Sequence, residues 1–211
     1  MPNLRLEILP ASQRRLWAEL QKNSRFLKDH RYYLAGGSAL ALQIGHRQSV
    51  DFDFFSQQKD LGRPAEKWLR GFKGSRIREG DAETLHAEIR AVKVSFIGAY
   101  RYPLLEPASD HGGIRIAGLL DIALMKLLAV THRATMRDYL DLAILLRDHF
   151  DLGELLQASL RKYGKNFNVM IPLRALVAFS DIDPETPVLL DRNLKASWQK
   201  ILRAAVKKAA E

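Results

Sequence analysis

A double glycine and a serine, followed closely by two aspartates, constrain the fold of this chain more than any other sequence feature. The stretch reads LAGGSALALQIGHRQSVDFDFFS over residues 34–56. Glycine permits backbone conformations that other residues avoid, so Gly36 and Gly37 indicate a tight turn. The turn joins a short strand expected at 32–35 to a helix expected at 38–44, which a further glycine closes.

Asp51 and Asp53 lie in a segment, residues 50–55, whose β-prone residues predict a strand. Side chains alternate between the two faces of a strand, so the two carboxylates project from one face, and Phe52 and Phe54 from the other. Carboxylates this close repel each other unless they are protonated or bridged by a cation. Their oxygens suit Mg²⁺ or Mn²⁺, which also bind phosphate oxygens. The pattern favours a metal site, and the simpler interpretation is a solvated edge strand.

The Gly-Gly-Ser turn adds a second anion-binding feature close to the aspartates. Backbone N–H groups at the start of a helix bind phosphate, so Gly36, Gly37 and Ser38 predict a phosphate-binding turn. Ser38 considered alone is better explained as a helix N-cap. Arg47, which precedes the strand, can meet a phosphate or orient an aspartate. Taken as a set, these residues favour a nucleotide site over a solvated strand.

Two other enzyme classes also use paired aspartates. Phosphatases that form an aspartyl-phosphate need a long βαβ alternation and a doubly wound sheet, which this pattern does not show. Metal-dependent glycosyltransferases usually carry the motif in larger domains, and they stay open as an alternative.

The rest of the pattern divides the chain into a mixed α/β front half and a helical back half, with the boundary near residue 115. In the front half, helices are expected at 10–30 and 63–72, strands at 76–78, 84–90 and 92–97, and a loop after them. In the back half, helices are expected at 119–130, 136–148, 152–163, 172–179 and 193–210. We therefore expect an α/β core with a small mixed sheet in residues 1–115. Residues 116–211 would form a helical region that packs on this core and completes the active-site cleft.

Composition narrows the classes of partner and compartment. The chain has 211 residues, no cysteine and a formal net charge of +9. The absence of cysteine excludes disulfides and thiolate metal sites and fits a reducing cytoplasm. The positive charge favours an anionic partner, with nucleic acid ahead of a membrane surface. The N-terminal residues have no apolar core of a signal peptide, and the densest apolar run is too short to span a bilayer.

The stretch GGSALALQIGHRQSVDFDFF (36–55) resembles the first motif of the DNA polymerase β-like nucleotidyltransferase superfamily. More closely, it resembles the AbiEii/AbiGii abortive-infection toxins of bacterial toxin–antitoxin systems. The resemblance continues through HAEIRAVKVSFIGAYRYPLLEP and GIRIAGLLDIALMKLLAVTHRATMRDYLDLAILL and covers about residues 32–150. It implies the nucleotidyltransferase fold and a metal-dependent transfer of a nucleoside monophosphate from an NTP to RNA. It also implies tRNA as one class of acceptor and a cognate antitoxin as a partner.

The resemblance also implies roles for individual residues. Gly36, Gly37 and Ser38 would hold the triphosphate, and Asp51 and Asp53 would bind the metal ions. Two further residues match later motifs of the superfamily: Lys126, as a contact to nucleotide phosphate, and Asp138, as a catalytic carboxylate with Asp141 nearby.

The residues around Lys126 and Asp138 can also be interpreted without the resemblance. The helix around Lys126 is apolar on nearly every side, so its ammonium needs a carboxylate, a phosphate or a path to water. Asp138 follows Thr135 at the spacing of a capping box, so a cap and a catalytic role stay equally open. Asp121 is expected to be an acidic residue that favours the start of its helix.

One position departs from the superfamily. Active members usually carry a third carboxylate on the strand beside the two aspartates, and in VKVSF the matching residue is Ser95, with Lys93 on the same face. Glu88 and Asp138 are candidates to complete the site. The alternative to an active enzyme is therefore a non-catalytic protein of the same fold that binds nucleotide or RNA, or one that a partner regulates.

Overall fold

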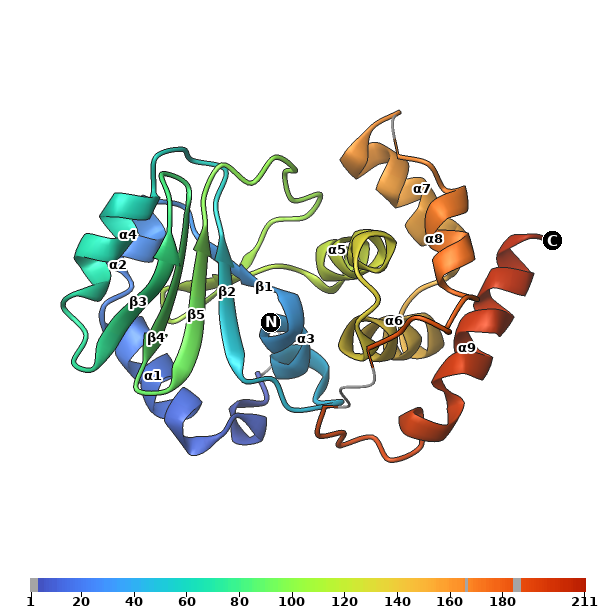
Figure 1. Ribbon diagram of the computed structural model, residues 1–211, viewed down its shortest axis with the longest axis horizontal. Coiled ribbons are helices and arrows are strands. Elements are labelled where there is room, and N and C mark those ends of the chain that lie inside the picture. The colour runs from blue at the N-terminus through green and yellow to red at the C-terminus, as the bar shows by residue number, and fades with distance from the viewer. Residues whose placement is uncertain (1–3, 166, 184–186) are drawn as a thin grey trace. The chain divides into compact units, whose positions relative to one another are not determined.

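The computed structural model describes residues 4–165, 167–183 and 187–211. The chain forms two compact units, Met1–Gly118 and Leu119–Glu211. The first is built around a β-sheet and the second consists of helices (Figure 1). The expected α/β class is confirmed, with a mixed sheet flanked by helices.

The sheet of the first unit has seven strands in the order β3-β4-β5-β2-β1-β7-β6. The strands are β1 (Tyr33–Ala35), β2 (Asp51–Phe55), β3 (Ser75–Gly80), β4 (Thr84–Ile89), β5 (Val92–Ile97), β6 (Ser109–His111) and β7 (Ile114–Ile116). Strand β2 pairs antiparallel with β1 and parallel with β5. The strand with the two aspartates is thus central in the sheet, which excludes the interpretation as a solvated edge.

One face of the sheet is buried under helices, as Figure 1 shows for α1 (Ala11–Lys22), α2 (Arg25–Asp29) and α4 (Gly62–Leu69). Phe52 and Phe54 of β2 are fully buried on this face. Trp17 of α1 contacts the Phe52 ring at 5.9 Å between centroids, and Trp68 of α4 contacts Phe96 of β5 at 5.6 Å. Burial of these apolar rings fixes which face of β2 is left for Asp51 and Asp53.

Three expectations for the first unit are wrong in detail. The helix expected at 10–30 is interrupted after Lys22, because α1 and α2 are separate helices. The loop expected before residue 115 contains the hairpin of β6 and β7, whose two turn glycines both have positive φ, 65° and 91°. Such angles suit a tight hairpin turn, which the double glycine signals. The strand expected at 50–55 begins one residue later, because Val50 lies outside β2 and is 57% exposed.

The first unit also contains a short 3-10 helix, η1 (Leu6–Ile8), and α3 (Gly36–Ile44), which connects β1 to the segment before β2. Gly45 ends α3 in the left-handed conformation with φ 71°, as the sequence predicts. Helix α3 therefore begins at the double glycine and ends at the next glycine along the chain.

The second unit consists of five helices in its described part: α5 (Leu119–His132), α6 (Met136–Asp148), α7 (Leu152–Tyr163), α8 (Met170–Ala175) and α9 (Leu194–Ala209). Helix α8 starts and ends earlier than the expected 172–179, with Pro172 in its first turn, where a missing N–H has no cost. Trp198 of α9 packs against Tyr139 of α6, with ring centroids 5.9 Å apart. Together, α5 and α6 carry the residues of the second unit that the sequence singles out.

Asp121 lies in the first turn of α5, as expected, but it does not face solvent. Its side chain is fully buried in α5, and the Lys162 ammonium of α7 donates to it over 2.5 Å. A buried carboxylate is tolerated because it is paired with a cation. This pair links α5 to α7. Among the described residues, no helix has the length and apolar character needed to cross a membrane.

Candidate active site

Asp51 and Asp53 project from the face of β2 opposite the buried phenylalanines. The burial along β2 alternates, with both aspartates half-buried and Phe52 fully buried between them. Asp53 pairs with Ala35 of β1 on one side and with Ser95 of β5 on the other. The predicted placement of two carboxylates on one face is confirmed, so both can ligate metal ions bound at this face.

The turn at Gly36 lies directly against Asp53. Gly36 has φ 71°, and a Cβ built on it would lie 3.2 Å from Oδ2 of Asp53. The missing side chain thus lets the carboxylate approach the backbone at the N-terminus of α3. Helix N-termini favour anions, so the backbone of this turn and the Asp53 carboxylate bring an anion-favouring group and a cation-favouring group together.

Ser38 is not the N-cap of α3, contrary to the interpretation of this residue alone. The helix begins at Gly36 with Ala35 in the N-cap position. Ser38 lies inside the first turn, is 1% exposed, and donates a hydrogen bond from Oγ to the backbone oxygen of Asp51. The reason is the antiparallel pairing of β1 and β2, which brings the start of α3 beside the start of β2. Ser38 therefore ties the Gly-Gly-Ser turn to strand β2.

Arg47 is buried beside the same turn. Its side chain is 2% exposed, and Nη1 donates to the backbone oxygen of Gln48 over 2.9 Å. A Cβ on Gly37 would lie 2.5 Å from Nη2 of Arg47, so the guanidinium rests against the Gly37 backbone. Ser49 donates to Oδ1 of Asp51 over 3.1 Å. The residues predicted in this stretch are thus brought together, and Ser49, which the sequence interpretation missed, joins them.

The strand beside β2 provides no third carboxylate. The register confirms that Ser95 is the residue opposite Asp53, and its hydroxyl lies 3.2 Å from Nδ1 of His86. Glu88 lies on β4, across β5 from β2, where it forms an ion pair with Arg78. That hydrogen bond lowers the pKa of Glu88. Among the described residues, no group of three or more His, Asp or Glu side chains is arranged to hold a metal ion. The donor set at β2 is therefore one pair of carboxylates, which suits a hard cation that keeps water and phosphate ligands.

In the second unit, Lys126 of α5 is bound by two carboxylates of α6. Its Nζ lies 2.7 Å from Oδ1 of Asp138 and 2.7 Å from Oδ2 of Asp141. All three side chains are buried, with 7% exposure for Lys126. Lysine and aspartates at this depth stabilise each other's charged forms. Of the alternatives that the sequence leaves open for Lys126, a carboxylate, a phosphate or a path to water, the structure shows carboxylates, and Asp141 shares that role equally with Asp138.

Two further residues hold Asp138 in place. Arg133 Nε lies 2.8 Å from Oδ2 of Asp138, and Thr135 Oγ1 donates to the same oxygen over 2.6 Å. Thr135 makes no side-chain cap to the backbone, so the capping-box interpretation is wrong. Burial raises the pKa of the Asp138 carboxyl, but the charge and hydrogen bond of Lys126, with Thr135 and Arg133, lower it below its usual range. Asp138 is therefore an ionised anchor for Lys126.

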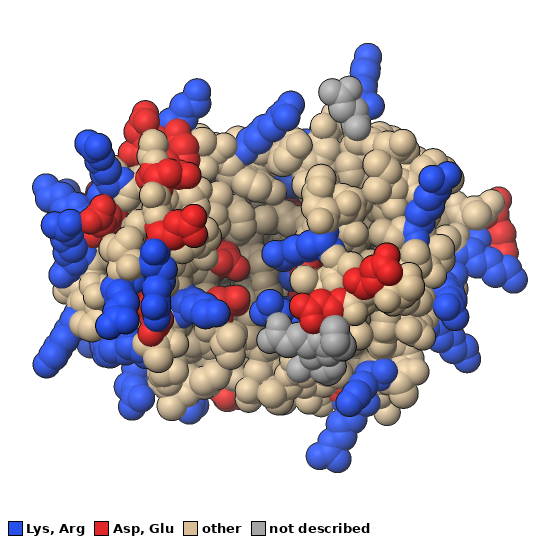
Figure 2. All heavy atoms as spheres, viewed as in Figure 1, with Lys and Arg blue, Asp and Glu red and all other residues tan. Residues whose placement is uncertain are grey.

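Surface charge does not by itself single out a nucleic-acid interface. Figure 2 shows Lys and Arg side chains spread over the visible face, with Asp and Glu side chains among them. On this face the basic side chains are thus dispersed, and the position of a binding surface must come from the local chemistry.

Solved structures with a similar fold are nucleotidyltransferases by their descriptions. The nucleotidyltransferase toxin MenT4 of Mycobacterium tuberculosis H37Rv aligns with a TM-score of 0.61 at 16% identity, over 94% of this chain and 84% of that chain. A putative nucleotidyltransferase of Helicobacter pylori aligns with a TM-score of 0.52 at 18% identity, over 92% and 96% of the two chains. At these identities, the likeness establishes the fold.

A sequence relative is also similar over most of the chain. It is an uncharacterized protein of Aquifex aeolicus (strain VF5), 36% identical over 181 residues, which make up 81% of this chain and 82% of the relative. The model of the AbiEii family, described as a nucleotidyl transferase toxin of a type IV toxin–antitoxin system, matches residues 19–116 and 104–211. The family match thus includes both the aspartate pair and the Lys126 cluster. The chain is therefore a nucleotidyltransferase that belongs to the AbiEii family of toxins.

Proposed function

We propose that this protein transfers a nucleoside monophosphate from an NTP to RNA, in a reaction that requires Mg²⁺ or Mn²⁺ bound by Asp51 and Asp53. The observation that carries the proposal is the placement of Asp53 against Gly36, at the start of α3. This close approach supports a site in which a metal ligand and a phosphate-binding turn act together. tRNA is the first acceptor to test, because the AbiEii resemblance implies this class.

The residues of the first unit have distinct roles in this proposal. Asp51 and Asp53 hold the metal ions, which neutralise the phosphates and activate the attacking hydroxyl when they are bound. Gly36, Gly37 and Ser38 form the turn against which the triphosphate lies. Arg47 supports that turn from beneath Gly37 and supplies positive charge to it.

The residues of the second unit complete the proposed machinery. In this proposal, residues 1–115 carry the metal site and residues 116–211 contribute Lys126 to the phosphates of the same nucleotide. Asp138 and Asp141 hold the Lys126 ammonium ionised and in place. Asp138 matches a carboxylate of a later superfamily motif. We assign it the role of positioning Lys126 in the catalytic site.

The family also supports a partner. Its description as one half of a toxin–antitoxin system leads us to propose a cognate antitoxin that restrains the activity. NTPs and RNA are cytoplasmic substrates, so we propose that the protein acts in the cytoplasm. Expression of this protein alone should arrest growth. Coexpression of the neighbouring gene should relieve that arrest if the gene encodes the antitoxin.

Label transfer tests the proposed function directly. Purified protein with Mg²⁺ and each radiolabelled NTP in turn is incubated with bulk tRNA, with other RNA and with no acceptor. The Asp51→Asn variant is the matched control, because it removes one negative charge without changing side-chain size. Label on RNA that the variant fails to transfer is the expected result and identifies the donor. Equal labelling by a folded Asp51→Asn variant would contradict the site assignment.

A second candidate function is nucleotide binding without catalysis of nucleotide transfer. Ser95 opposite Asp53 is the observation that favours it, because a hydroxyl is a poor ligand and a poor base at the position of the third carboxylate. Metal-dependent NTP binding without label transfer to any acceptor would support this candidate.

A further inference from the structure

A cavity of about 610 Å³ lies in the first unit, at one end of strands β1, β2 and β7. Its volume is within the range of small-molecule sites, roughly 300–1,000 Å³. Arg31, Tyr33, Gln57, Leu104 and Arg115 are among its lining residues. None of them has a role in the function proposed above, so the cavity is a separate feature of the same unit.

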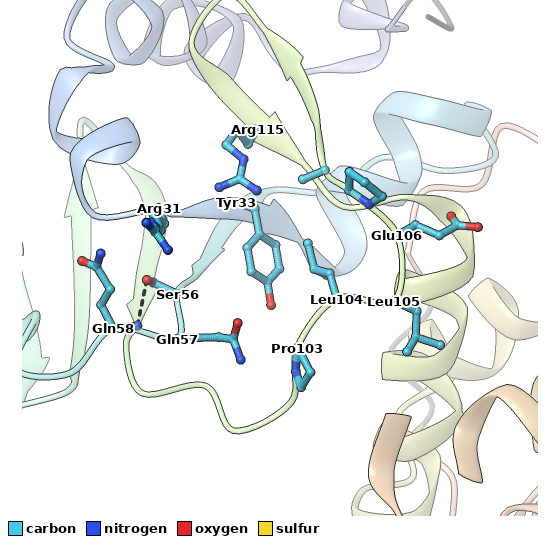
Figure 3. A pocket seen from close by; sticks show the side chains of 12 residues that line it. Arg31, Tyr33, Ser56, Gln57, Gln58, Pro103, Leu104, Leu105, Glu106 and Arg115 are labelled. Atoms are coloured by element: carbon cyan, nitrogen blue, oxygen red, sulfur yellow. Dashed lines mark hydrogen bonds between the residues drawn. The ribbon is translucent and has the colours of Figure 1, made fainter. Parts of the chain in front are cut away.

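The charges in this cavity favour an anion. Arg31 and Arg115 both line it, and within the described part of the chain neither guanidinium is engaged in an ion pair. Glu106 is the acidic residue of the lining, and Figure 3 shows its carboxylate pointing away from Tyr33 and the two guanidinium groups. Arginine is suited to phosphate because its donors match two phosphate oxygens at once.

A series of aromatic rings leads out of the cavity along the face of the sheet that carries Asp51 and Asp53. Tyr33 stacks on Phe55 with centroids 6.0 Å apart, Phe55 contacts Tyr100 at 5.0 Å, and Tyr100 contacts Tyr102 at 6.0 Å. Phe55, Tyr100 and Tyr102 are half-buried, so part of each remains open to solvent. Arg101 lies over the Tyr102 ring at 5.6 Å. Rings interleaved with arginines are the means by which proteins hold single-stranded nucleic acid.

The strand register places the cavity beside the metal site. Tyr33 pairs with Phe55 and with Arg115, and Phe55 is two residues beyond Asp53 on the same face of β2. Two residues of a strand advance by about 7 Å. The ring series and the metal-binding carboxylates thus share one face of the sheet, within about one nucleotide of each other.

We propose that the cavity and the ring series bind a nucleotide of the single-stranded end of the acceptor RNA. This rests on the proposed function, in which the phosphates of the donor NTP are held at Asp51, Asp53 and the Gly36 turn. Arg31 and Arg115 form a second cationic locus, so the phosphate they attract belongs to another nucleotide. Gln57 offers an amide donor and acceptor to the base edge, and the tyrosines offer stacking.

RNA binding without catalysis tests this inference. A labelled single-stranded RNA of mixed sequence is titrated with protein in the absence of NTP and metal, so a failure of the proposed transfer reaction does not affect the readout. We expect Tyr102→Leu to weaken RNA binding by about tenfold, the loss expected for one base stack. Tyr102→Phe keeps the ring and should bind like the wild type.

The arginines are tested by the salt dependence of the same binding. Arg31→Ala and Arg115→Ala should each weaken RNA binding and lower the slope of log affinity against log salt by about one. Arg14→Ala is the charge-matched control, because α1 packs on the opposite face of the sheet through Trp17. Arg115→Gln, which removes the charge and keeps a long polar side chain in β7, replaces Arg115→Ala if the latter fails to fold.

Each outcome bears on the proposal. Weakened RNA binding in the cavity variants (Arg31→Ala and Arg115→Ala) and in Tyr102→Leu, with unchanged affinity for Mg²⁺–NTP, supports an acceptor site. Weakened NTP affinity with unchanged RNA binding would assign the cavity to the donor base and overturn the proposal. Wild-type protein that does not bind RNA, or cavity variants that bind it normally, would overturn it as well.

Discussion

Ser95 lies directly opposite Asp53 in the parallel pairing of β5 with β2. Its hydroxyl is 3.2 Å from Nδ1 of His86, the next residue across the same face of the sheet. Ser95 and His86 therefore occupy the two positions beside Asp53 where a third carboxylate would stand. On the proposed function, Asp51 and Asp53 are left as the carboxylate ligands of the metal.

Substitutions at Asp53 and at Ser95 should distinguish a metal ligand from the residue beside it in the sheet. We expect Asp53→Asn to lower the transfer rate by more than about 100-fold, beyond the 10–100-fold typical of residues that only support a ligand. Ser95→Ala should stay within about twofold of the wild type, because a serine hydroxyl contributes little to binding a hard cation. Initial rates at saturating NTP and metal are the measurement. A large loss in Ser95→Ala would instead make this hydroxyl part of the active site.

Gly36→Ala should remove activity through geometry. A left-handed backbone conformation costs a non-glycine residue roughly 1–2 kcal/mol, and the new Cβ would also press on Oδ2 of Asp53 from 3.2 Å. Gly164 is a matched control, because it has φ 82° and nothing within 4 Å of a Cβ. Chemical denaturation should show a loss of stability for both variants, and label transfer should fall only in Gly36→Ala. Equal transfer by both would show that the close approach at Gly36 has no catalytic importance.

Lys126→Met should cost both stability and nucleotide affinity. The variant removes the Lys126 cation from two buried carboxylates and leaves Asp138 with the Arg133 pair, a loss of roughly 3–5 kcal/mol in the free energy of unfolding. Lys162→Met breaks the other buried pair of this unit, with Asp121, and serves as the control for stability. Calorimetric titration with Mg²⁺–NTP at low temperature should show lost affinity in Lys126→Met alone. Unchanged affinity in Lys126→Met would make Lys126 a structural residue.

Asp138 should contribute to the acid sensitivity of the protein. Because its folded pKa lies below its unfolded value, its stabilising effect is complete above the unfolded pKa of about 3.9 and is lost as the pH falls through the lowered one. The free energy of unfolding should therefore fall less steeply in Asp138→Asn than in the wild type between about pH 5 and about pH 3. Urea titrations across this range measure both slopes. Parallel slopes would show that Asp138 does not carry this dependence.

The sequence alone was sufficient for the local features of the site. Alternation along DFDFF, with two buried phenylalanines, placed Asp51 and Asp53 on one face because a strand has a period of two. The double glycine predicted the turn at Gly36, since a left-handed φ there favours glycine. A lysine in a nearly all-apolar helix required a buried anion, and Lys126 has two.

Tertiary structure decided what depends on pairing between distant segments. Ser38 looks like a helix cap in the sequence, but the pairing of β1 with β2 directs its hydroxyl to the Asp51 backbone. Asp121 is an acidic residue at a helix start, as the sequence predicts, but only the packing of α7 supplies Lys162 and allows it to be buried. Local sequence sets the conformation and the exposed face of each segment. The identity of a polar group's partner is fixed only when the elements pack, because burial then makes an unpaired charge too costly.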